Sequence, residues 1–478
     1  MNVLHLPWLE LAIGIPLLGA AVASRLRDAE TARRWCLALC ASTFVLSVAA
    51  WGDFAWTGAT LAHDPGPLGK VLGDFLEIDQ FSAPLLALAA LLYLLTSVAT
   101  LRTKVRRFSF AWTLFSLAVV LATLACRNPW GIVGLLAANT VPPYLELRAR
   151  GKPTGVYTPH MGLFVALLVI GWSVVEWEGP ERAHSLLAVV PLLVAVLLRA
   201  GSIPFHCWIT DLFENASFGR ALLHVTPMMG AYAAVRLVLP IAPDWVLRSI
   251  GIVSLVTAVY AAGMALVQTE ARRMFCYVFL SHAALVLVGL ETVSAIGLTG
   301  ALCMWISVGL SLAGFGLTIR ALEARHGRLS LAGYHGVYEH APLLAVCFLL
   351  TGLGSVGFPG TIGFLGAELL VDGAVQTFPY VGIAVVIAAA LNGIAVLQAY
   401  FKLFTGTRHI SSVPLQIGNR ERVAVLTLAA LILGGGLLPQ PIVSGRYRAA
   451  STILQERREL AAPHPAIAAR VQTRLHSN

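Results

Sequence analysis

Hydrophobic residues run through this chain in blocks of about twenty, the length that an α-helix needs to cross a bilayer. Short polar segments that carry most of the charges separate these blocks. The pattern predicts an all-α polytopic membrane protein with about 14 transmembrane helices. We place these helices at residues 3–24, 33–52, 81–101, 109–126, 130–147, 159–176, 184–213, 216–239, 246–267, 273–292, 295–320, 341–375, 379–402 and 421–439.

Two of the predicted helices, the seventh and the twelfth, are too long for one straight crossing. The seventh is expected to break near Gly201 and Pro204, and the twelfth near Gly357 and Pro359. Broken helices at matching positions of two halves are typical of transporters with inverted repeats. We therefore predict two inverted five-helix repeats. The expected division is helices 1–3 in residues 1–107, the first repeat in 108–240, the second repeat in 241–405, and helix 14 with a polar tail in 406–478.

The charged residues follow an alternating pattern from loop to loop. Basic residues follow the odd-numbered helices, and acidic residues follow the even-numbered ones. The basic loops include Arg25, Arg102, Arg148, Arg272 and Arg320, and the acidic loops include Asp53 and Glu176. Because basic loops stay in the cytoplasm, we expect both termini outside it, in the plasma (inner) membrane of a bacterium. The tail after Pro441 is compatible with a surface helix or with a flexible end.

Composition agrees with a membrane protein and argues against nucleic acid as a partner. Hydrophobic residues make up 58% of the chain and charged residues only 12%, whereas a soluble protein carries roughly 25% charged residues. The net charge of +9 is spread over short loops. The sequence contains no Gly-rich phosphate loop, no CxxC pair and no nucleophile elbow. We therefore expect no catalytic site, metal site or cofactor on this chain, and place any redox or hydrolytic chemistry on partner chains.

The stretch from Arg199 to Arg236 concentrates ionisable residues inside an apolar region, where charge costs a few kcal/mol per residue. Arg199 either snorkels from a helix end or lies inside the bundle, and the apolar sequence that follows it favours the interior. His224 is either a titratable relay or a neutral histidine bonded to a backbone carbonyl. His206 follows the break in helix 7 and is a weaker candidate for the ion path.

Other charged residues of this region are predicted to serve structure. Asp211 and Glu214 are expected in the turn between helices 7 and 8, where they would pair with Arg220. Arg236 is expected at the outer end of helix 8. In helix 12, Glu368 and Asp372 lie four residues apart, hence on one helix face, and complete the set of candidates for a proton path.

Several short motifs resemble the antiporter-like membrane subunits of respiratory complex I (NADH:quinone oxidoreductase). The resemblance extends over nearly the whole chain and is closest to subunit M; subunit L, Mrp antiporters and membrane-bound hydrogenase subunits are related. The motifs are IDQFS at 78–82, VPPY at 141–144, PFHCWI at 204–209, QTEARR at 268–273 and GFPG at 357–360. The resemblance implies a proton- or cation-conducting subunit of fourteen helices, with charged residues along the middle of the membrane.

Matched position by position, the chain departs from the charged residues of that family. The lysine of helix 7 becomes Arg199, which keeps the charge but hardly exchanges its proton. His224 matches a histidine of subunit L. The other matched positions are apolar, namely Ala137 in helix 5, Met228 in helix 8, Val308 in helix 11 and Ala367 in helix 12, where Glu368 follows one residue later.

Three functions remain open from the sequence. The first is a membrane subunit of a proton-translocating, complex I-like assembly with an altered proton path, in which NADH, quinone or other redox cofactors belong to partner subunits. The second is a non-conducting paralogue that docks partner subunits. The third is the membrane subunit of an inorganic-carbon uptake pump beside a soluble zinc protein. Each implies a hetero-oligomer with other membrane subunits, with a quinone-reducing, hydrogenase-type or zinc-containing soluble partner.

Overall fold

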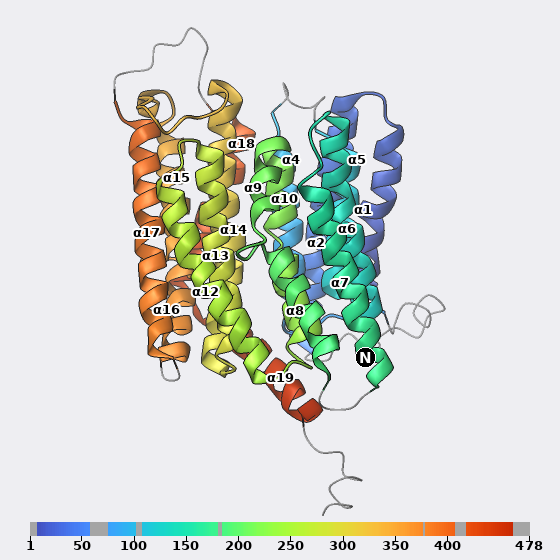
Figure 1. The fold of residues 1–478 in the computed structure, drawn as a ribbon. Helices are drawn as coiled ribbons and strands as arrows, with labels where there is room; N and C mark the ends of the chain where they lie inside the picture. Colours follow the sequence, from blue (N-terminus) through green and yellow to red (C-terminus); the bar gives the residue numbers. More distant parts are fainter. Residues whose placement is uncertain are drawn as a thin grey trace, which may run out of the picture.

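The computed structural model describes residues 7–57, 75–101, 108–179, 184–375, 378–406 and 417–461. Within these ranges the chain forms a bundle of long helices that share one general direction (Figure 1). The helices are α1 (Trp8–Arg25), α2 (Ala29–Thr57), α4 (Ala83–Val98), α5 (Phe110–Ala125), α6 (Pro129–Ala149), α7 (Tyr157–Glu178), α8 (Leu186–Ala200), α9 (Cys207–Asn215), α10 (Phe218–Val225), α11 (Met229–Ala233), η2 (Ala234–Val238), α12 (Asp244–Leu266), α13 (Ala271–Glu291), α14 (Ala295–His326), η3 (Tyr338–His340), α15 (Pro342–Val356), α16 (Ile362–Val375), α17 (Pro379–Phe404), α18 (Asn419–Leu437) and α19 (Gln440–Ala461).

Each predicted transmembrane segment contains helix, so the all-α membrane class is confirmed. Among the described residues, eight helices are long and apolar enough to cross a membrane, or nine if the bent pair α18 and α19 counts as one. The broken segments divide into helices that are too short to meet this criterion alone. The count of fourteen crossings therefore stays a prediction.

Both predicted helix interruptions lie where the sequence places them. Gly201 ends α8 in the left-handed conformation, with φ of 73°, and the Ser202 N–H bonds to the Leu197 carbonyl at 2.9 Å. Gly357 ends α15 in the same way, with φ of 91°. Glycine adopts this conformation at little steric cost, so these residues terminate the two helices within the apolar sequence.

A third interruption divides the predicted helix 216–239, which we expected to be continuous. Met228 stands between α10 and α11 with a left-handed φ of 52°, and a π-helical turn, η2, follows α11. Pro227 has no N–H to donate to a helical hydrogen bond, which accounts for a break at this place.

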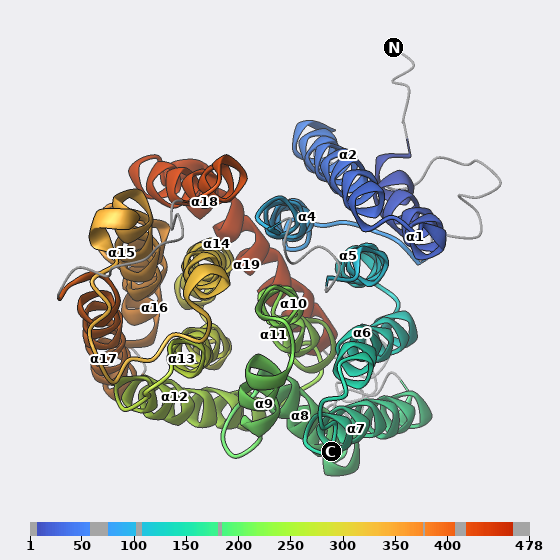
Figure 2. The same ribbon diagram turned by 90° about the horizontal axis from the view of Figure 1, so that it is seen from above.

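Three segments form the centre of the bundle, and the others surround them (Figure 2). The apolar windows of Phe218–Val238 and α14 are each 94% buried, and that of α13 is 89% buried, against 28% for α7. The central segments are thus packed by protein on all sides. The outer helices leave apolar faces exposed, as expected for contact with lipid.

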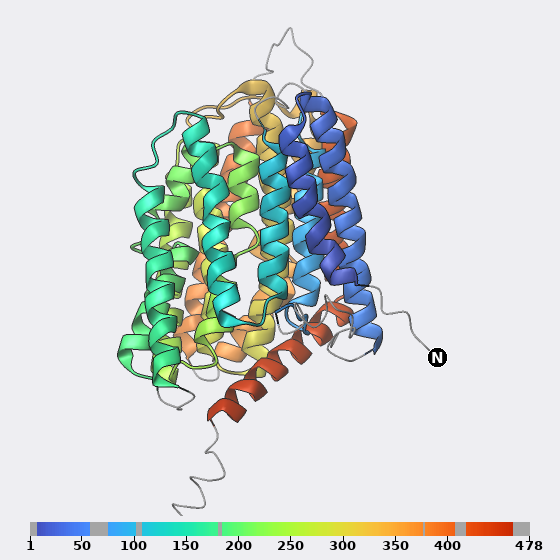
Figure 3. The ribbon, with the colours of Figure 1, turned by 90° about the vertical axis from the view of Figure 1, so that its right-hand side faces the viewer.

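The last helix, α19, lies obliquely across one end of the bundle (Figure 3). It bends by 78° from α18. The guanidinium of Arg446 is buried and donates to the backbone carbonyls of Gln80 and Phe81, and Arg457 donates to the Leu239 carbonyl at 2.9 Å. Of the two possibilities for the tail, the surface helix therefore holds as far as Ala461, and residues 462–478 lie outside the described ranges.

Candidate functional site

Arg199 lies inside the bundle, at the last turn of α8, with 3% of its surface exposed. Its Nη2 donates to the Asn139 side-chain oxygen at 3.1 Å and to the His224 carbonyl at 3.4 Å. Its guanidinium carbon lies 5.3 Å from the centre of the Trp208 ring, a cation–π contact. Amide, carbonyl and aromatic ring are all uncharged, so among the residues that the structure describes no carboxylate lies beside the buried positive charge of Arg199.

His224 lies next to Arg199 on α10 and is 6% exposed. Its Nε2 is 3.4 Å from the Tyr157 hydroxyl, which donates to the Thr140 carbonyl at 2.9 Å. Because that hydroxyl uses its proton on Thr140, it can accept one from the imidazole Nε2. The edge of Trp208 packs on the same imidazole ring, with centroids 5.9 Å apart. The histidine thus touches a hydroxyl of a neighbouring helix and an aromatic wall.

Arg220 lies one turn before His224 on α10, and its ion-pair partner is Glu146 on α6. The Nε of Arg220 is 2.9 Å from the Glu146 carboxylate, and Nη2 donates to the Ser109 carbonyl at 2.8 Å. The other oxygen of Glu146 accepts from the Ser217 N–H at 3.0 Å, at the start of α10. Both side chains are at most 10% exposed, so this is a buried ion pair that fixes α10 against α6.

A small cavity connects Arg220 with His224. Its volume is about 10 Å³, close to the lower limit for one water molecule. Its walls combine polar and apolar side chains, and the Nη1 of Arg220, which is buried without a hydrogen-bond partner among the described residues, belongs to a side chain that lines it. The wall is formed by Tyr93, Thr113, Ser116, Asn139, Pro142, Pro143, Arg220, Leu223 and His224. We call six residues the first-half cluster, because all of them lie within 108–240, the predicted first repeat. They are Asn139, Glu146, Tyr157, Arg199, Arg220 and His224.

His206 lies outside the first-half cluster. It precedes α9 at the break in helix 7, half-buried between the rings of Tyr260 and Tyr277, whose centroids are 5.7 and 6.3 Å away. Its Nδ1 has no hydrogen-bond partner within the described part of the chain. The break therefore turns His206 toward α12 and α13, away from Arg199.

The predicted pairing of Asp211 and Glu214 with Arg220 is wrong. Both acidic residues lie within α9 instead of a turn. Asp211 accepts from the Asn215 amide at 2.9 Å, and Glu214 lies 3.9 Å from Arg273. The reason is that α9 extends as a helix to Asn215, which leaves the buried face of α10 to Glu146.

Glu368 and Asp372 are not brought to the first-half cluster either. Both lie on α16 and are exposed on the surface of the bundle. Ala367, one residue before Glu368, packs partly buried against the core. One residue corresponds to about 100° around a helix, and this rotation carries the carboxylate from the interior to the surface.

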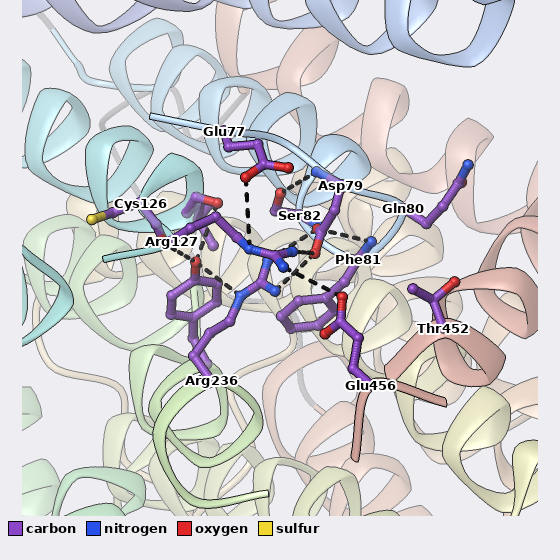
Figure 4. A network of polar contacts seen from close by, with 12 residues as sticks. Glu77, Asp79, Gln80, Phe81, Ser82, Cys126, Arg127, Arg236, Thr452 and Glu456 are labelled. Atoms are coloured by element: carbon purple, nitrogen blue, oxygen red, sulfur yellow. Dashed lines mark hydrogen bonds and ion pairs between the residues drawn. The ribbon is translucent and has the colours of Figure 1, made fainter. Parts of the chain in front are cut away.

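Arg236 takes part in an ion-pair network at the end of the bundle that α19 covers (Figure 4). Its two Nη atoms bond to both oxygens of Asp79, at 2.7 and 2.9 Å. Arg127 reaches the same carboxylate at 2.9 Å and also contacts Glu456 of α19 at 3.3 Å and Glu77 at 3.9 Å. Arg236 thus lies in an ion-pair network, and the structural role that the sequence suggests for it stays a prediction.

The Asp79 carboxyl, which precedes α4, stays ionised because of this network. Burial alone raises the pKa of this carboxyl, but the Arg236 guanidinium and the Ser82 N–H, together with Arg127, lower it more. The net pKa therefore lies well below the ordinary value of 3.8. Asp79, before the start of α4, thus acts as a permanent negative charge that holds Arg236 of η2 and Arg127, and Arg127 in turn contacts Glu456 of α19.

Comparison with known proteins identifies the architecture. Residues 168–392 match the family described as NADH:quinone oxidoreductase/Mrp antiporter, TM. The resemblance to antiporter-like membrane subunits is confirmed. A NAD(P)H-quinone oxidoreductase chain 4 of Nostoc sp. is 24% identical over 487 residues, covering 92% of this chain and 90% of the relative. NADH-quinone oxidoreductase subunit M of Mycobacterium tuberculosis is 28% identical over 259 residues, covering 52% and 46%.

A solved structure shows the same fold over most of the chain. It is respiratory complex I from Thermus thermophilus with bound NADH, in which one chain superposes with a TM-score of 0.80 at 20% identity. The match covers 95% of this chain and 100% of that chain. At this identity the likeness establishes an antiporter-like fold.

Two apolar residues that the sequence singles out, Val308 and Met228, lie in the interior of this antiporter-like fold. Val308 is buried in α14, and Met228 forms the break between α10 and α11. Met228 also lines a second small cavity beside Arg199, of about 20 Å³, whose far wall consists of Phe279, Ala283 and Leu287 of α13. On the side of α13, which belongs to the predicted second repeat (residues 241–405), Arg199 therefore faces apolar side chains.

The interior of residues 241–405 contains hydroxyl, amide and imidazole groups that bond to one another or to the backbone. The Asn392 amide donates to the Ser281 hydroxyl at 2.7 Å, which donates to the Ala258 carbonyl at 2.8 Å. His282 is 2% exposed, and its Nδ1 lies 2.7 Å from the Val278 carbonyl. Within the described ranges, no group of three or more His, Cys, Asp or Glu side chains is arranged to hold a metal ion.

Asn139, Glu146 and Tyr157 are the residues of the site that sequence reasoning missed. Asn139 is an amide in the apolar run 130–147, and an unexplained polar residue at that depth was a usable signal. Glu146 stands among arginines near the end of the same run, where it resembles an ordinary loop charge. Tyr157 precedes its predicted helix, and nothing in the sequence indicates that its hydroxyl meets His224.

Proposed function

We propose that this chain is a membrane subunit of a hetero-oligomeric assembly of the complex I and Mrp type, and that it carries an altered path for protons in its first half. The single observation that supports this most is the buried positive charge of Arg199 beside His224, Tyr157 and Asn139. Such a charge at bilayer depth costs several kcal/mol and is typical of an ion path.

Within this proposal, the residues have different roles. A guanidinium stays protonated, so Arg199 acts as a fixed charge that sets the potential around His224 and does not pass a proton itself. His224 is the group that takes up and releases the proton. A water molecule in the cavity between His224 and Arg220 extends the path toward Glu146 and the end of the bundle opposite α19.

The proposal includes a topology. Fourteen crossings in two inverted repeats, with helices 7 and 12 broken, agree with the helices at each predicted segment. The basic loops then place α19 and the Asp79 network outside the cytoplasm, in a bacterial plasma membrane. NADH, quinone or other redox cofactors belong to partner subunits, as do any zinc or hydrogenase centres.

The test is ion flux through the intact assembly. The assembly is purified from its native membrane, its other chains are identified by mass spectrometry, and it is reconstituted into vesicles. Arg199→Ala should lower proton flux about tenfold or more while the subunits still co-purify. Arg248→Ala is the matched control, since Arg248 is an exposed arginine that lies over the Phe378 ring at 4.5 Å. It should leave flux unchanged.

A non-conducting docking paralogue is the second candidate function. The apolar wall of Phe279, Ala283 and Leu287 beside Arg199 favours it, because a path that continues into the second half needs polar groups there. This candidate predicts that Arg199→Ala leaves flux intact and that deletion of the chain only loosens the assembly. Unchanged flux in Arg199→Ala vesicles with full subunit content would decide for it.

A further inference from the structure

Helix α16 presents two unpaired carboxylates on the surface of the bundle. Phe364, Glu368 and Asp372 follow at intervals of four and are all exposed, so they form one face of the helix, which we call the α16 acidic face. Within the described residues neither carboxylate has an ion-pair or hydrogen-bond partner. The carboxylates of Glu368 and Asp372 therefore lie on the side of α16 that does not pack against the rest of the bundle.

The packing of α16 shows how deep Glu368 lies. A Cβ at Gly366 would meet the Met304 backbone of α14 at 2.8 Å, and a Cβ at Gly300 of α14 would collide with the Leu370 backbone. Glu368 is thus level with the part of α14 between these contacts. At about 1.5 Å per residue, this level is about 10 Å inside the Ala295 end of α14. Helix α14 has 32 residues, about 48 Å at this rise, whereas a hydrocarbon core is about 30 Å thick, so Glu368 lies at the edge of the hydrocarbon.

A carboxylate in contact with lipid at this depth is disfavoured. The neighbouring helix α17 shows what a lipid-facing surface looks like in this protein. Its exposed residues include Ile383, Val386, Ile387 and Ile394, and all four are aliphatic. The contrast between the two adjacent helices indicates that the α16 acidic face is covered by protein instead of lipid.

The break before α16 supports the same conclusion independently. Phe358 and Pro359 are exposed in the irregular backbone between α15 and α16, whereas Gly360 packs against Gly436 of α18. Irregular backbone at bilayer depth is tolerated where protein or a water-filled cavity covers it, and not against lipid. The exposed part of the break and the α16 acidic face follow each other directly along the chain, so one partner can cover both.

We propose that the α16 acidic face binds a transmembrane helix of another subunit, which places a lysine or arginine against Glu368. The charge of the face selects this chemistry, because a buried carboxylate is stable only when a cation or several donors meet it. Phe358 and Phe364 supply the apolar contacts beside the ion pair. The inference rests on the hetero-oligomeric part of the proposed function, and it goes further by naming the docking face and the partner's charge.

A photocrosslinking experiment in native membranes tests this directly. The probe p-benzoylphenylalanine replaces Phe364 in one strain and Ile387 of α17, which is 45% exposed, in a second strain. The Phe364 probe should crosslink to a transmembrane peptide of a different subunit that contains lysine or arginine. The Ile387 probe should give no protein crosslink. Crosslinks of Phe364 to lipid alone, or to a second copy of this chain, would overturn the inference.

Substitution of Glu368 supplies a second readout. Glu368→Leu should lower co-purification of the crosslinked subunit about tenfold or more, because the partner's cation loses its counter-charge. Glu368→Gln, which can still accept hydrogen bonds, should have a smaller effect. If the face meets lipid, leucine is the better residue and co-purification stays at the wild-type level, which would overturn the inference.

The two proposals fail in different ways. If the wild-type chain is purified without any other subunit, the hetero-oligomeric function fails and this inference with it. If partner subunits co-purify, and Glu368→Leu retains them all while the Phe364 probe finds lipid, the proposed function stands and only the docking face is wrong.

Discussion

The two regions that the sequence predicts as repeats, residues 108–240 and 241–405, differ in what they bury, and we call them the first and the second half. Residues 108–240 bury Arg199, Arg220 and His224. Residues 241–405, in the part that the structure describes, bury His282 and several hydroxyls and amides but no arginine, and the Glu323 side chain, 7% exposed, is paired with Arg272. The two candidate carboxylates of this region, Glu368 and Asp372, lie on its surface. Among the described residues of these two regions, fully buried arginines are therefore found in 108–240 and not in 241–405.

The halves also differ in how their helices are held together. In the first half the Arg220–Glu146 ion pair joins α10 to α6. In the second half α14 and α16 approach through glycines, such as Gly366 against the Met304 backbone. Close packing of glycines, without an ion pair among the described residues, thus holds these two helices together in the antiporter-like fold. The α14–α16 contact therefore does not depend on interior charge, which is why fold and activity need separate tests.

The largest effect is expected for the ion pair of the first half. Glu146→Ala leaves Arg220 buried without its counter-charge, which should destabilise the protein by about 3 to 5 kcal/mol. Stability can be measured as resistance of the purified assembly to denaturant. Replacing both residues, with Glu146→Gln and Arg220→Gln together, should cost less than Glu146→Ala alone.

A surface ion pair of the second half serves as the matched control for this prediction. Arg328 and Glu270 are 3.5 Å apart and both are about half exposed. Arg328→Ala should change stability by about 1 kcal/mol or less. Equal losses of stability for Glu146→Ala and Arg328→Ala would show that the buried ion pair contributes no more than the exposed one, and would contradict the comparison.

The Asp79 network should give the next largest effect, and a pH dependence. Asp79→Asn removes a charged acceptor from Arg236 and should cost about 2 to 3 kcal/mol at neutral pH. Because the folded-state pKa of Asp79 lies below the ordinary 3.8, its contribution is complete above that value and is lost as the pH falls further. Thermal stability of wild type and variant from pH 7 to about pH 3 measures this. A difference that stays constant down to the lowest pH would contradict it.

Glycine packing in the second half should respond to a single methyl group. In Gly366→Ala the new Cβ meets the Met304 backbone nitrogen at 2.8 Å, so α16 must shift, at a cost of about 1 to 2 kcal/mol. Gly263→Ala in α12 is the control, since nothing lies within 4 Å of its Cβ position. That variant should be as stable as wild type or slightly more stable. Gly366→Ala with unchanged thermal stability would show that α14 and α16 are not closely packed.

The fold was predictable from the sequence because long apolar runs and their glycine breaks are local signals. The breaks at Gly201 and Gly357 follow from single residues that adopt the left-handed conformation. The break at Met228 was not expected, since methionine rarely adopts that conformation, and only Pro227 pointed to it.

The candidate site was predictable only in part. Arg199 and His224 were visible as charged residues in an apolar run, whereas Asn139 and Tyr157 come from helices distant in sequence and meet them only through packing. Glu368 was visible in the sequence, but the sequence does not show on which side of α16 it lies. A shift of one residue along α16 decides whether its carboxylate lies inside or outside, and the helix orientation that decides this is set by the packing against α14.

The most direct test of the account compares two buried histidines, one from each half. His224→Ala and His282→Ala are made in the same assembly, and proton flux is measured in reconstituted vesicles at equal subunit content. A path through the first half predicts a loss of about tenfold or more for His224→Ala, equal to about 1.4 kcal/mol in the barrier, and nearly full flux for His282→Ala. Full flux in His224→Ala, or a larger loss in His282→Ala, would contradict it.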